Sequence, residues 1–500
     1  MTTRKHKTIT HPDRFFIGGK WTAPSTPSVF NVISPSTEDV FLTVAEAQAS
    51  DMNRAVEAAR IAFDEGPWPR MSHAERAVYL EAFAAGMAAR TRDLAHIWTS
   101  EMGVVHKVAE ALIPAGANVF SYYAGLAATF PFEEQHIPER GGFGLLVREP
   151  VGVVAAIIPW NFPVMLITWK LAPALLAGCT VILKASPEAP GAAYVIAEIA
   201  EAAGLPPGVL NVVTAERAVS EMLVRNPGID KVTFTGSTAA GKKIASICGE
   251  RVARCTLELG GKSAALVLDD YDITKAAETL TAGTRVMTSQ ICSALTRVVV
   301  TRRRHDALVE ALSASFAATK VGDPFDSGTN MGPLAMRRQR DRVENYIAKG
   351  RDEGARLAAG GGRPAHLNRG FFIEPTLFSH VSNDMTIARD EIFGPVLSVI
   401  PADDEAHAIK IANDSNYGLN ASVFTNDAEK AYLMARQIRS GTVGQNGSRT
   451  DFSIAFGGFK QSGIGREGGT EGLLPFLETK TIVLDAAPDH LRASSTKHEF

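Results

Sequence analysis

The sequence is poor in cysteine: its 500 residues include only Cys179, Cys248, Cys255 and Cys292. These form no CxxC pair and follow no regular spacing, which excludes a disulfide scaffold and a zinc ribbon. Free thiols suit a reducing compartment, so we expect a cytoplasmic protein. The twelve histidines include no HxH or HExxH pattern, and we expect no metal site. A GxSxG elbow is also missing, which argues against a serine hydrolase.

The chain also lacks a dominant charge and an unbroken apolar span. Its 51 basic and 54 acidic side chains leave a net charge of −3, so we expect neither nucleic acid nor a membrane as a partner. Residues 151–169 are uncharged over a length that could cross a bilayer. Pro159, Asn161 and Pro163 interrupt this run, so a buried strand, a turn and a buried helix explain it better. The basic N-terminal segment has no apolar region after it and does not resemble a secretory signal.

What the sequence does contain is an alternation of two periodicities. Helical spacing covers residues 51–63 and, after a capping box at Ser72 and Glu75, continues to residue 90, so we expect the first third to be helical. From about residue 150, β-branched runs alternate with helical stretches, which is typical of βαβ units in a doubly wound parallel sheet. The expected strands are residues 152–158, 180–184, 209–213, 231–235 and 264–268, with helices at 164–177 and 191–203.

A second α/β series follows the first. Its expected strands are residues 297–301 and 396–400, and its expected helices are 305–320, 337–359, 404–413 and 428–440. A last strand is expected at residues 479–484, where a free edge would invite pairing with another chain.

Two glycine-rich segments partly match phosphate-binding loops. Residues 236–243 (GSTAAGKK) place Lys243 where a P-loop needs Ser or Thr to hold magnesium, which disfavours an ATPase. The segment still joins an expected strand to an expected helix, so its backbone N–H groups predict an anion site. Residues 463–468 (GIGREG) match GxGxxG, but no βαβ unit contains them, and we discard them as a dinucleotide fingerprint.

Six further motifs occur in order: PWNFP (159–163), FTGST (234–238), ELGGK (258–262), QIC (290–292), EIFGP (391–395) and FGGFK (456–460). Each is weak alone. Together they resemble the NAD(P)-dependent aldehyde dehydrogenase superfamily over residues 15–485.

The resemblance implies a covalent oxidation of an aldehyde at Cys292. A thiolate adds to the carbonyl, and the adduct loses a hydride to the nicotinamide, leaving a thioester. The implied oxyanion donors are the Asn161 side chain and the backbone N–H of Cys292. Glu258 is the implied general base for thioester hydrolysis, and Lys170 with Glu467 is the implied pair that relays protons from it.

The resemblance also implies a cofactor site. NAD is the expected cofactor, with NADP as an accepted alternative, because Pro187 stands where the family often has a ribose-binding Glu and Glu188 lies one residue further on. The implied cofactor residues are Ile158, Pro159, Trp160, Lys184, Ser186, Gly236, Ser237, Gly241, Glu258, Leu259, Gly260, Glu391 and Phe393.

The implied substrate residues are apolar and predict a hydrophobic aldehyde: Phe162, Leu166, Trp169, Phe452 and Phe456. The segment before Cys292 departs from the family pattern. Met287 and Ser289 replace the usual Asn and Gly, so we expect a shifted loop in which Ser289 occupies a position suited to φ > 0.

We therefore expect a doubly wound α/β cofactor-binding domain, a second α/β catalytic domain and a β-rich oligomerisation arm. The expected bounds are 1–127 and 150–260, then 261–476, then 128–149 and 477–500. The resemblance implies a homodimer or homotetramer. Two other functions stay open: a CoA-acylating semialdehyde dehydrogenase, whose relatives usually lack the Glu at position 258, and a non-catalytic binding protein, which would be expected to lose Cys292 or Glu258.

Overall fold

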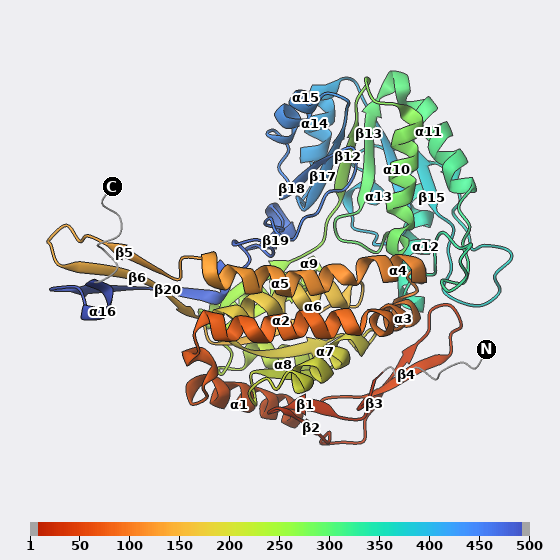
Figure 1. Ribbon diagram of the computed structural model, residues 1–500. Helices are drawn as coiled ribbons and strands as arrows, with labels where there is room; N and C mark the ends of the chain where they lie inside the picture. Colours follow the sequence, from red (N-terminus) through yellow and green to blue (C-terminus); the bar gives the residue numbers. More distant parts are fainter. Residues whose placement is uncertain (1–8, 493–500) are drawn as a thin grey trace.

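The computed structural model describes residues 9–492 and contains two large sheets, a three-stranded arm and a hairpin (Figure 1). The expectations for residues 1–8 and for the end of the arm, residues 493–500, lie outside the described residues. The predicted α/β fold is confirmed.

The first sheet has the order β19-β11-β10-β7-β8-β9-β1-β2. Its five central strands are parallel and almost wholly buried, which explains the continuous apolar runs of β7 and β8. Antiparallel edges are added by strands that come from distant parts of the chain. The strands are β1 (Phe15–Ile17), β2 (Lys20–Thr22), β7 (Val153–Ile157), β8 (Thr180–Ala185), β9 (Leu210–Thr214), β10 (Lys231–Thr235), β11 (Arg254–Glu258) and β19 (Gly463–Ile464).

Helices from the first half of the chain pack around this sheet; α1, α6, α7 and α9 contact its strands directly. The capping box predicted at the start of α2 is confirmed: Ser72 Oγ accepts the N–H of Glu75 at 3.2 Å, and the Glu75 carboxylate accepts the N–H of Ser72 at 2.7 Å. The helices are α1 (Ala49–Asp64), α2 (His73–Ala89), α3 (Thr91–Met102), α4 (His106–Leu112), α5 (Pro114–Thr129), α6 (Pro163–Ala177), α7 (Gly191–Ala202), α8 (Arg217–Arg225) and α9 (Thr238–Glu250).

The second sheet has the order β14-β15-β16-β13-β12-β17-β18 and is parallel except at β14. Its strands are β12 (Ser263–Val267), β13 (Leu295–Thr301), β14 (Arg356–Ala359), β15 (Thr376–Ser379), β16 (Val396–Ala402), β17 (Asn420–Phe424) and β18 (Thr442–Gln445). Its helices are α10 (Ile273–Arg285), α11 (Arg302–Ala317), α12 (Arg337–Asp352), α13 (Thr386–Arg389), α14 (Glu405–Asn413) and α15 (Ala428–Ala435).

The arm extends away from both large sheets (Figure 1). It consists of β5 (Glu133–His136), β6 (Phe143–Pro150) and β20 (Leu477–Leu484), and β6 lies between the other two. A separate hairpin is formed by β3 (Val29–Ile33) and β4 (Val40–Ala45), and a short helix, α16 (Asp489–Arg492), ends the described chain.

Three expectations about elements were wrong. The first third is not only helical outside the expected arm, because β1 to β4 also lie there; these strands are too short or too exposed to show a clear pattern. The long helix expected over 337–359 ends at Asp352, since Gly354 adopts a φ of 88° and a strand follows. The helix expected over 428–440 ends at Ala435.

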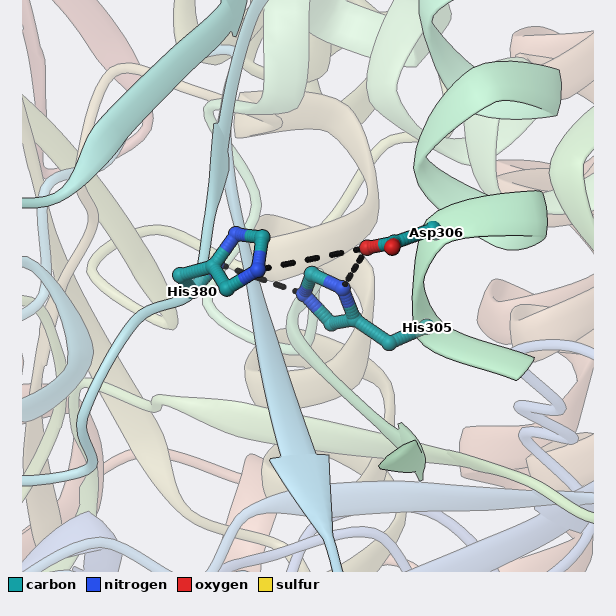
Figure 2. Close-up of side chains that lie close together, drawn as sticks. All are labelled: His305, Asp306 and His380. Carbon is teal, nitrogen blue, oxygen red and sulfur yellow. Dashed lines mark hydrogen bonds and ion pairs between the residues drawn. The ribbon is translucent and has the colours of Figure 1, made fainter. Parts of the chain in front are cut away.

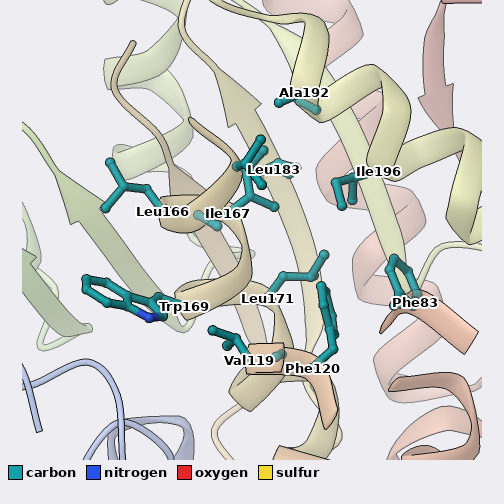
Figure 3. Close-up of a cluster of buried hydrophobic side chains, with 14 of the residues drawn as sticks. Phe83, Val119, Phe120, Leu166, Ile167, Trp169, Leu171, Leu183, Ala192 and Ile196 are labelled. Atoms are coloured by element: carbon teal, nitrogen blue, oxygen red, sulfur yellow. The ribbon is translucent and has the colours of Figure 1, made fainter. Parts of the chain in front are cut away.

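The uncharged run at residues 151–169 forms β7, a turn and the start of α6, as predicted. All fifteen residues of α6 are buried, and α6 lies in the largest hydrophobic cluster between α2, α5, α7 and β8 (Figure 3). None of the helices between residues 9 and 492 has the length and hydropathy that a bilayer span requires.

Candidate active site

Cys292 follows a short 3-10 turn, η2 (Val286–Ser289), with an unusual backbone. Met287, Thr288 and Ser289 have φ angles of 52°, 53° and 56°, the left-handed conformation that residues with a side chain avoid. Each costs on the order of 1–2 kcal/mol. The surrounding structure must therefore hold this turn in place.

Two side chains that sequence reasoning missed hold the turn. The Thr288 hydroxyl donates to the carbonyl of Pro333 at 3.1 Å. The buried Gln290 amide donates to the carbonyl of Met287 at 3.0 Å and accepts the N–H of Ala335 at 3.0 Å. The only sequence signal for this arrangement was the departure from the family pattern in the residues before Cys292.

Asn161 lies against the same loop. Its Nδ2 donates to the carbonyl of Gln290 at 3.0 Å, two residues before Cys292. Trp98, also missed from the sequence, donates from Nε1 to the carbonyl of Asn161 at 2.9 Å and stacks on Phe162 with 4.4 Å between ring centroids. The structure thus brings Asn161 to the nucleophile loop and fixes it from behind.

The surroundings of Cys292 keep its thiol protonated at neutral pH. Burial raises the pKa of Cys292 to about 12, and the nearby carboxyl groups of Glu391 and Glu258 act in the same direction. Backbone N–H groups at Cys292 and Ser293 oppose the shift. Attack by this sulfur therefore requires a group that removes its proton.

Glu258 ends β11 with only 2% of its surface exposed. Within residues 9–492, neither of its carboxyl oxygens has a hydrogen-bond partner. Burial raises its pKa well above the usual value and Glu467 adds to this, whereas Lys170 and Arg466 oppose it. A Cβ at Gly457 would lie 2.7 Å from Oε1 of Glu258, so a side chain there would displace the carboxyl group. The buried carboxyl group can exchange a proton because both oxygens remain free.

Lys170 and Glu467 form an ion pair near Glu258. Lys170 is fully buried in α6, donates to Oγ1 of Thr235 at 2.6 Å, and forms an ion pair with Oε1 of Glu467. Glu467 is held by two backbone hydrogen bonds with Phe456, and its N–H donates at 2.8 Å. Lys170 and Glu467, the predicted relay pair, therefore lie close enough to Glu258 to shift the pKa of its carboxyl group.

Two adjacent glycines connect Glu391 to the nucleophile loop. The N–H of Gly261 donates to Oε1 of Glu391 at 3.1 Å. A Cβ at Gly260 would lie 2.5 Å from Oε2 of Glu391, and one at Gly261 would lie 2.3 Å from the carbonyl oxygen of Cys292. Burial raises the pKa of Glu391 to about 7, against the hydrogen bond from Gly261.

The anion site predicted from the glycine-rich segment lies at the N-terminus of α9. Ser237 caps the helix, and its Oγ accepts the N–H three residues on at 3.3 Å. Gly241 packs so close to Leu259 that a Cβ would lie 2.4 Å from a Leu259 methyl group. Gly236 precedes the cap, so the predicted residues share one helix N-terminus, where backbone N–H groups favour an anion.

A compact polar group follows β8. Lys184, the last residue but one of the strand, is 7% exposed, and burial lowers its pKa to about 8. Glu188 accepts a hydrogen bond from Ser186 and forms an ion pair with Arg338 of α12. Burial alone would raise the pKa of Glu188, but these two partners outweigh it and keep the pKa below its usual value. Arg338 is a further residue that the sequence did not reveal.

The remaining predicted cofactor residues continue from the end of β7. The N–H of Ile158 donates to the carbonyl of Lys184 at 3.1 Å, and Trp160 contacts Phe393 edge-on with 5.4 Å between centroids. Phe393 has a φ of 63°, and Gln339 Nε2 donates to its carbonyl at 2.6 Å.

The predicted substrate residues belong to the hydrophobic cluster that Cys292 borders. Trp169 and Phe456 are buried with 5.1 Å between ring centroids. Leu166 lies on α6, the helix that also carries Trp169 (Figure 3). Phe162 and Phe452 are partly buried against this cluster. The surroundings of the thiol are therefore apolar on this side.

Comparison with known proteins agrees with this arrangement. The aldehyde dehydrogenase family profile matches residues 21–482. The chain is 43% identical over 478 residues to a geranial dehydrogenase from Castellaniella defragrans, covering 95% of this chain and 99% of that protein. The chain belongs to the aldehyde dehydrogenase family.

Proteins with the same fold have been solved in complex with NAD+. A Mycobacterium tuberculosis aldehyde dehydrogenase in complex with NAD+ has a TM-score of 0.92 and 45% identity, covering 94% of this chain and 98% of that one. An aldehyde dehydrogenase C mutant from Pseudomonas syringae, in complex with NAD+ and octanal, has a TM-score of 0.92 and 39% identity, covering 96% and 99%. The predicted class, an NAD(P)-dependent enzyme that oxidises aldehydes, is confirmed, and the acylating and non-catalytic alternatives are not favoured.

A second cluster of polar side chains lies outside this site. His305, Asp306 and His380 come together near the start of α11 (Figure 2). His305 accepts the N–H of His380 at Nε2 (3.2 Å), so its proton sits on Nδ1, 2.8 Å from Asp306. A metal at Nδ1 would need the proton on Nε2, which faces a donor. The hydrogen bonds therefore explain this cluster better than a cation does.

The left-handed turn before Cys292 gives a stability prediction. Ser289→Gly should leave the dehydrogenase more stable than Ser289→Ala by about 1 kcal/mol, because both remove the hydroxyl but only alanine keeps a Cβ at φ > 0. Thermal unfolding of both variants measures the difference. Equal stability would show that residue 289 does not hold this conformation.

Proposed function

We propose that the dehydrogenase oxidises a hydrophobic aldehyde to the carboxylic acid, with Cys292 as nucleophile, Asn161 as oxyanion donor and Glu258 as general base. The observation that carries this proposal is the convergence on one buried site of the thiol, the side-chain amide beside its loop and a carboxyl group with two free oxygens. NAD(P), when bound, supplies the hydride acceptor. This chain would hold it at the N-terminus of α9 and at Glu391, which packs against Gly260 and Gly261.

The first half of the reaction forms a carbon–sulfur bond. The partly exposed Cys292 thiol gives its proton to water as its sulfur adds to the carbonyl carbon, so this half of the reaction does not require Glu258. Charge then develops on the carbonyl oxygen. The Asn161 amide and the backbone N–H of Cys292 donate to that oxygen, and the turn at η2 keeps both donors in place beforehand.

The second half cleaves the thioester that remains after hydride transfer. Glu258 removes a proton from the attacking water, and the Cys292 sulfur leaves as the acid forms. Lys170 and Glu467 lie next to Glu258 and offer the proton a route away from it. A carboxyl group at this position supports hydrolysis rather than transfer to coenzyme A.

The substrate class is proposed from the apolar residues around the thiol. Phe162, Leu166, Trp169, Phe452 and Phe456 offer no charged group to an aldehyde chain. The names of two relatives, a geranial dehydrogenase and an enzyme crystallised with octanal, support a hydrophobic aldehyde of medium length.

Glu258→Gln tests the division of the reaction into two halves. We expect a burst of reduced cofactor near one per active site, followed by turnover that is roughly 100- to 10,000-fold slower, because Gln cannot take a proton from water. Rapid-mixing absorbance at 340 nm with octanal measures both phases, and mass spectrometry should find an acyl group on Cys292.

The matched control is Cys292→Ala, which should bind cofactor and give neither burst nor turnover. Rescue of Glu258→Gln by coenzyme A would favour the acylating class. Loss of the burst would mean that Glu258 already acts before hydride transfer, and activity in Cys292→Ala would overturn the covalent mechanism.

The adenosine end of the cofactor is proposed to lie at Lys184, Ser186 and Glu188. Arg338 neutralises Glu188, so a 2′-phosphate would meet two cations and a paired carboxylate. We therefore propose that NAD is used and that NADP is disfavoured only modestly.

Arg338→Ala should weaken NADP binding about 10-fold while NAD binding stays nearly constant, because the change removes one charge-assisted contact and exposes the Glu188 carboxylate. Fluorescence titration with both cofactors measures this. Arg337→Ala is the control, since Arg337 pairs with Glu38 instead. Equal effects on both cofactors would place the 2′ position elsewhere.

The assembly is proposed to be a homodimer or homotetramer built through the arm, residues 128–149 and 477–500. Val483 and Leu484 of β20 are 63% and 40% exposed, and Ile137 at the arm's tip is 93% exposed. Among the described strands, β20 pairs only with β6, so one edge is open to another chain.

We further propose that residues 1–127 and 150–260 form the cofactor-binding domain and residues 261–476 the catalytic domain. β19 lies within 261–476 but joins the first sheet. A cytoplasmic location is proposed because all four cysteines are free thiols.

Val483→Lys should shift the assembly to a smaller species, because a charge on the open edge opposes pairing. Light scattering after size-exclusion chromatography measures the mass. Val78→Lys on the surface of α2, where Val78 is 68% exposed, is the matched control and should leave the mass unchanged. An unchanged mass in Val483→Lys would move the interface away from the arm.

A further inference from the structure

A row of buried polar residues runs along one face of β10 and β11. Alternate residues of a strand share a face, so Lys231, Thr233 and Thr235 point the same way. In register, Thr233 lies beside Thr256 and Thr235 beside Glu258. Each of these five residues is at most 7% exposed. Central strands of a parallel sheet are normally apolar on both faces, so this row needs an explanation.

Some buried polar atoms in the row and in the neighbouring Glu467 lack a hydrogen-bond partner within the described residues. At the end farthest from Glu258, Lys231 Nζ donates to Oγ1 of Thr256 at 2.7 Å and lies 5.1 Å from the centre of the Phe476 ring. In the described part of the chain, Oγ1 of Thr233 and Oε2 of Glu467 have no partner. Buried polar atoms without a protein partner are normally satisfied by internal water.

The electrostatics of Lys231 suit proton exchange near neutrality. Burial lowers the pKa of Lys231 to about 8. The groups that face it are Cys179, Cys255, Glu467 and Lys170; the first three raise the pKa, and Lys170 lowers it. A group that carries a proton only part of the time at pH 8 can accept one and release it.

We propose that Lys231 is the distal station of a buried proton relay that begins at Glu258 and passes Lys170, Glu467 and the threonine row. The inference rests on the proposed role of Glu258. Each hydrolysis leaves a proton on Glu258. This proton moves to the Lys170–Glu467 pair and then, through water held by Thr233 and Glu467, to the neutral amine of Lys231. The resulting ammonium ion gives the proton to solvent beside the exposed start of β11 at Arg254 before the next turnover. The strand rise puts Lys231 about 13 Å along β10 from Thr235, so the relay carries the proton well away from the thioester.

Lys231→Met tests the relay. The burst of reduced cofactor should stay near one per site, because hydride transfer precedes proton removal. Steady turnover should fall by less than the 10²–10⁴ of a direct base, roughly 10-fold, and small primary amines should restore part of it. In the wild-type enzyme kcat should rise with pH through about 8, as the Lys231 amine becomes able to accept protons, and the variant should lose this limb.

A readout without turnover comes from stability. The pKa of Lys231 in the folded protein is about 8, below the ordinary 10.5, so between these values the unfolded chain binds more protons. Raising the pH through this window should therefore stabilise the wild type relative to Lys231→Met. Thermal unfolding of both proteins from pH 7 to pH 10.5 measures the difference.

Thr233→Val is the second variant and keeps Lys231 in place. It should slow turnover and raise the solvent deuterium isotope effect on kcat, whereas Thr281→Val, which removes a buried hydroxyl on α10, should do neither. If Lys231→Met fails to fold, a wild-type rate and isotope effect in Thr233→Val overturn the relay. If Lys231→Met folds, a wild-type rate with the pH limb retained overturns it. Failure of Glu258→Gln to stall would instead refute the proposed role of Glu258 itself.

Discussion

The ion pair between Lys170 and Glu467 is the interaction on which the rest of the site depends. Lys170 is a charge in the middle of a fully buried helix, where desolvation costs several kcal/mol unless a partner offsets it. Its partner comes from the far end of the chain, so the pair ties α6 to the segment around Phe456. Through Thr235 it also reaches β10. One buried contact thereby fixes three separate segments around Glu258.

Glycines allow the same segments to approach one another closely. At Gly260, Gly261 and Gly457, an added Cβ would collide with Glu391, with the Cys292 carbonyl and with Glu258, respectively. At Gly261 the collision would be with backbone, so that position needs the absence of a side chain; at Gly260 and Gly457 a side chain would instead push the carboxyl groups out of place. The site is therefore compact because carboxyl groups lie directly against backbone, and their burial is what raises their pKa values.

Much of this arrangement follows from sequence pattern, and the rest does not, for physical reasons. Buried parallel strands such as β7 and β8 have continuous apolar or β-branched runs, so their positions were predictable to within a residue. Each of β1 to β4 is too short or too exposed for that. Lys170 is the sole charge between residues 151 and 183, and a charge in such an apolar run indicates that a partner is needed. By contrast, Thr288, Gln290 and Trp98 act through hydrogen bonds to backbone carbonyls, which no local pattern reveals. Arg338 reaches Glu188 across 150 residues.

The raised pKa of Cys292 has a consequence for the resting site. Its thiol holds a proton there, so the apolar surroundings contain no uncompensated thiolate. A protonated thiol is a poor nucleophile and a poor target for oxidants, which act on thiolates. The charge needed for catalysis must then arise only when a carbonyl group accepts it, beside donors already fixed by the left-handed turn at Thr288. The strain in that turn is the cost of having those donors in position before the charge forms.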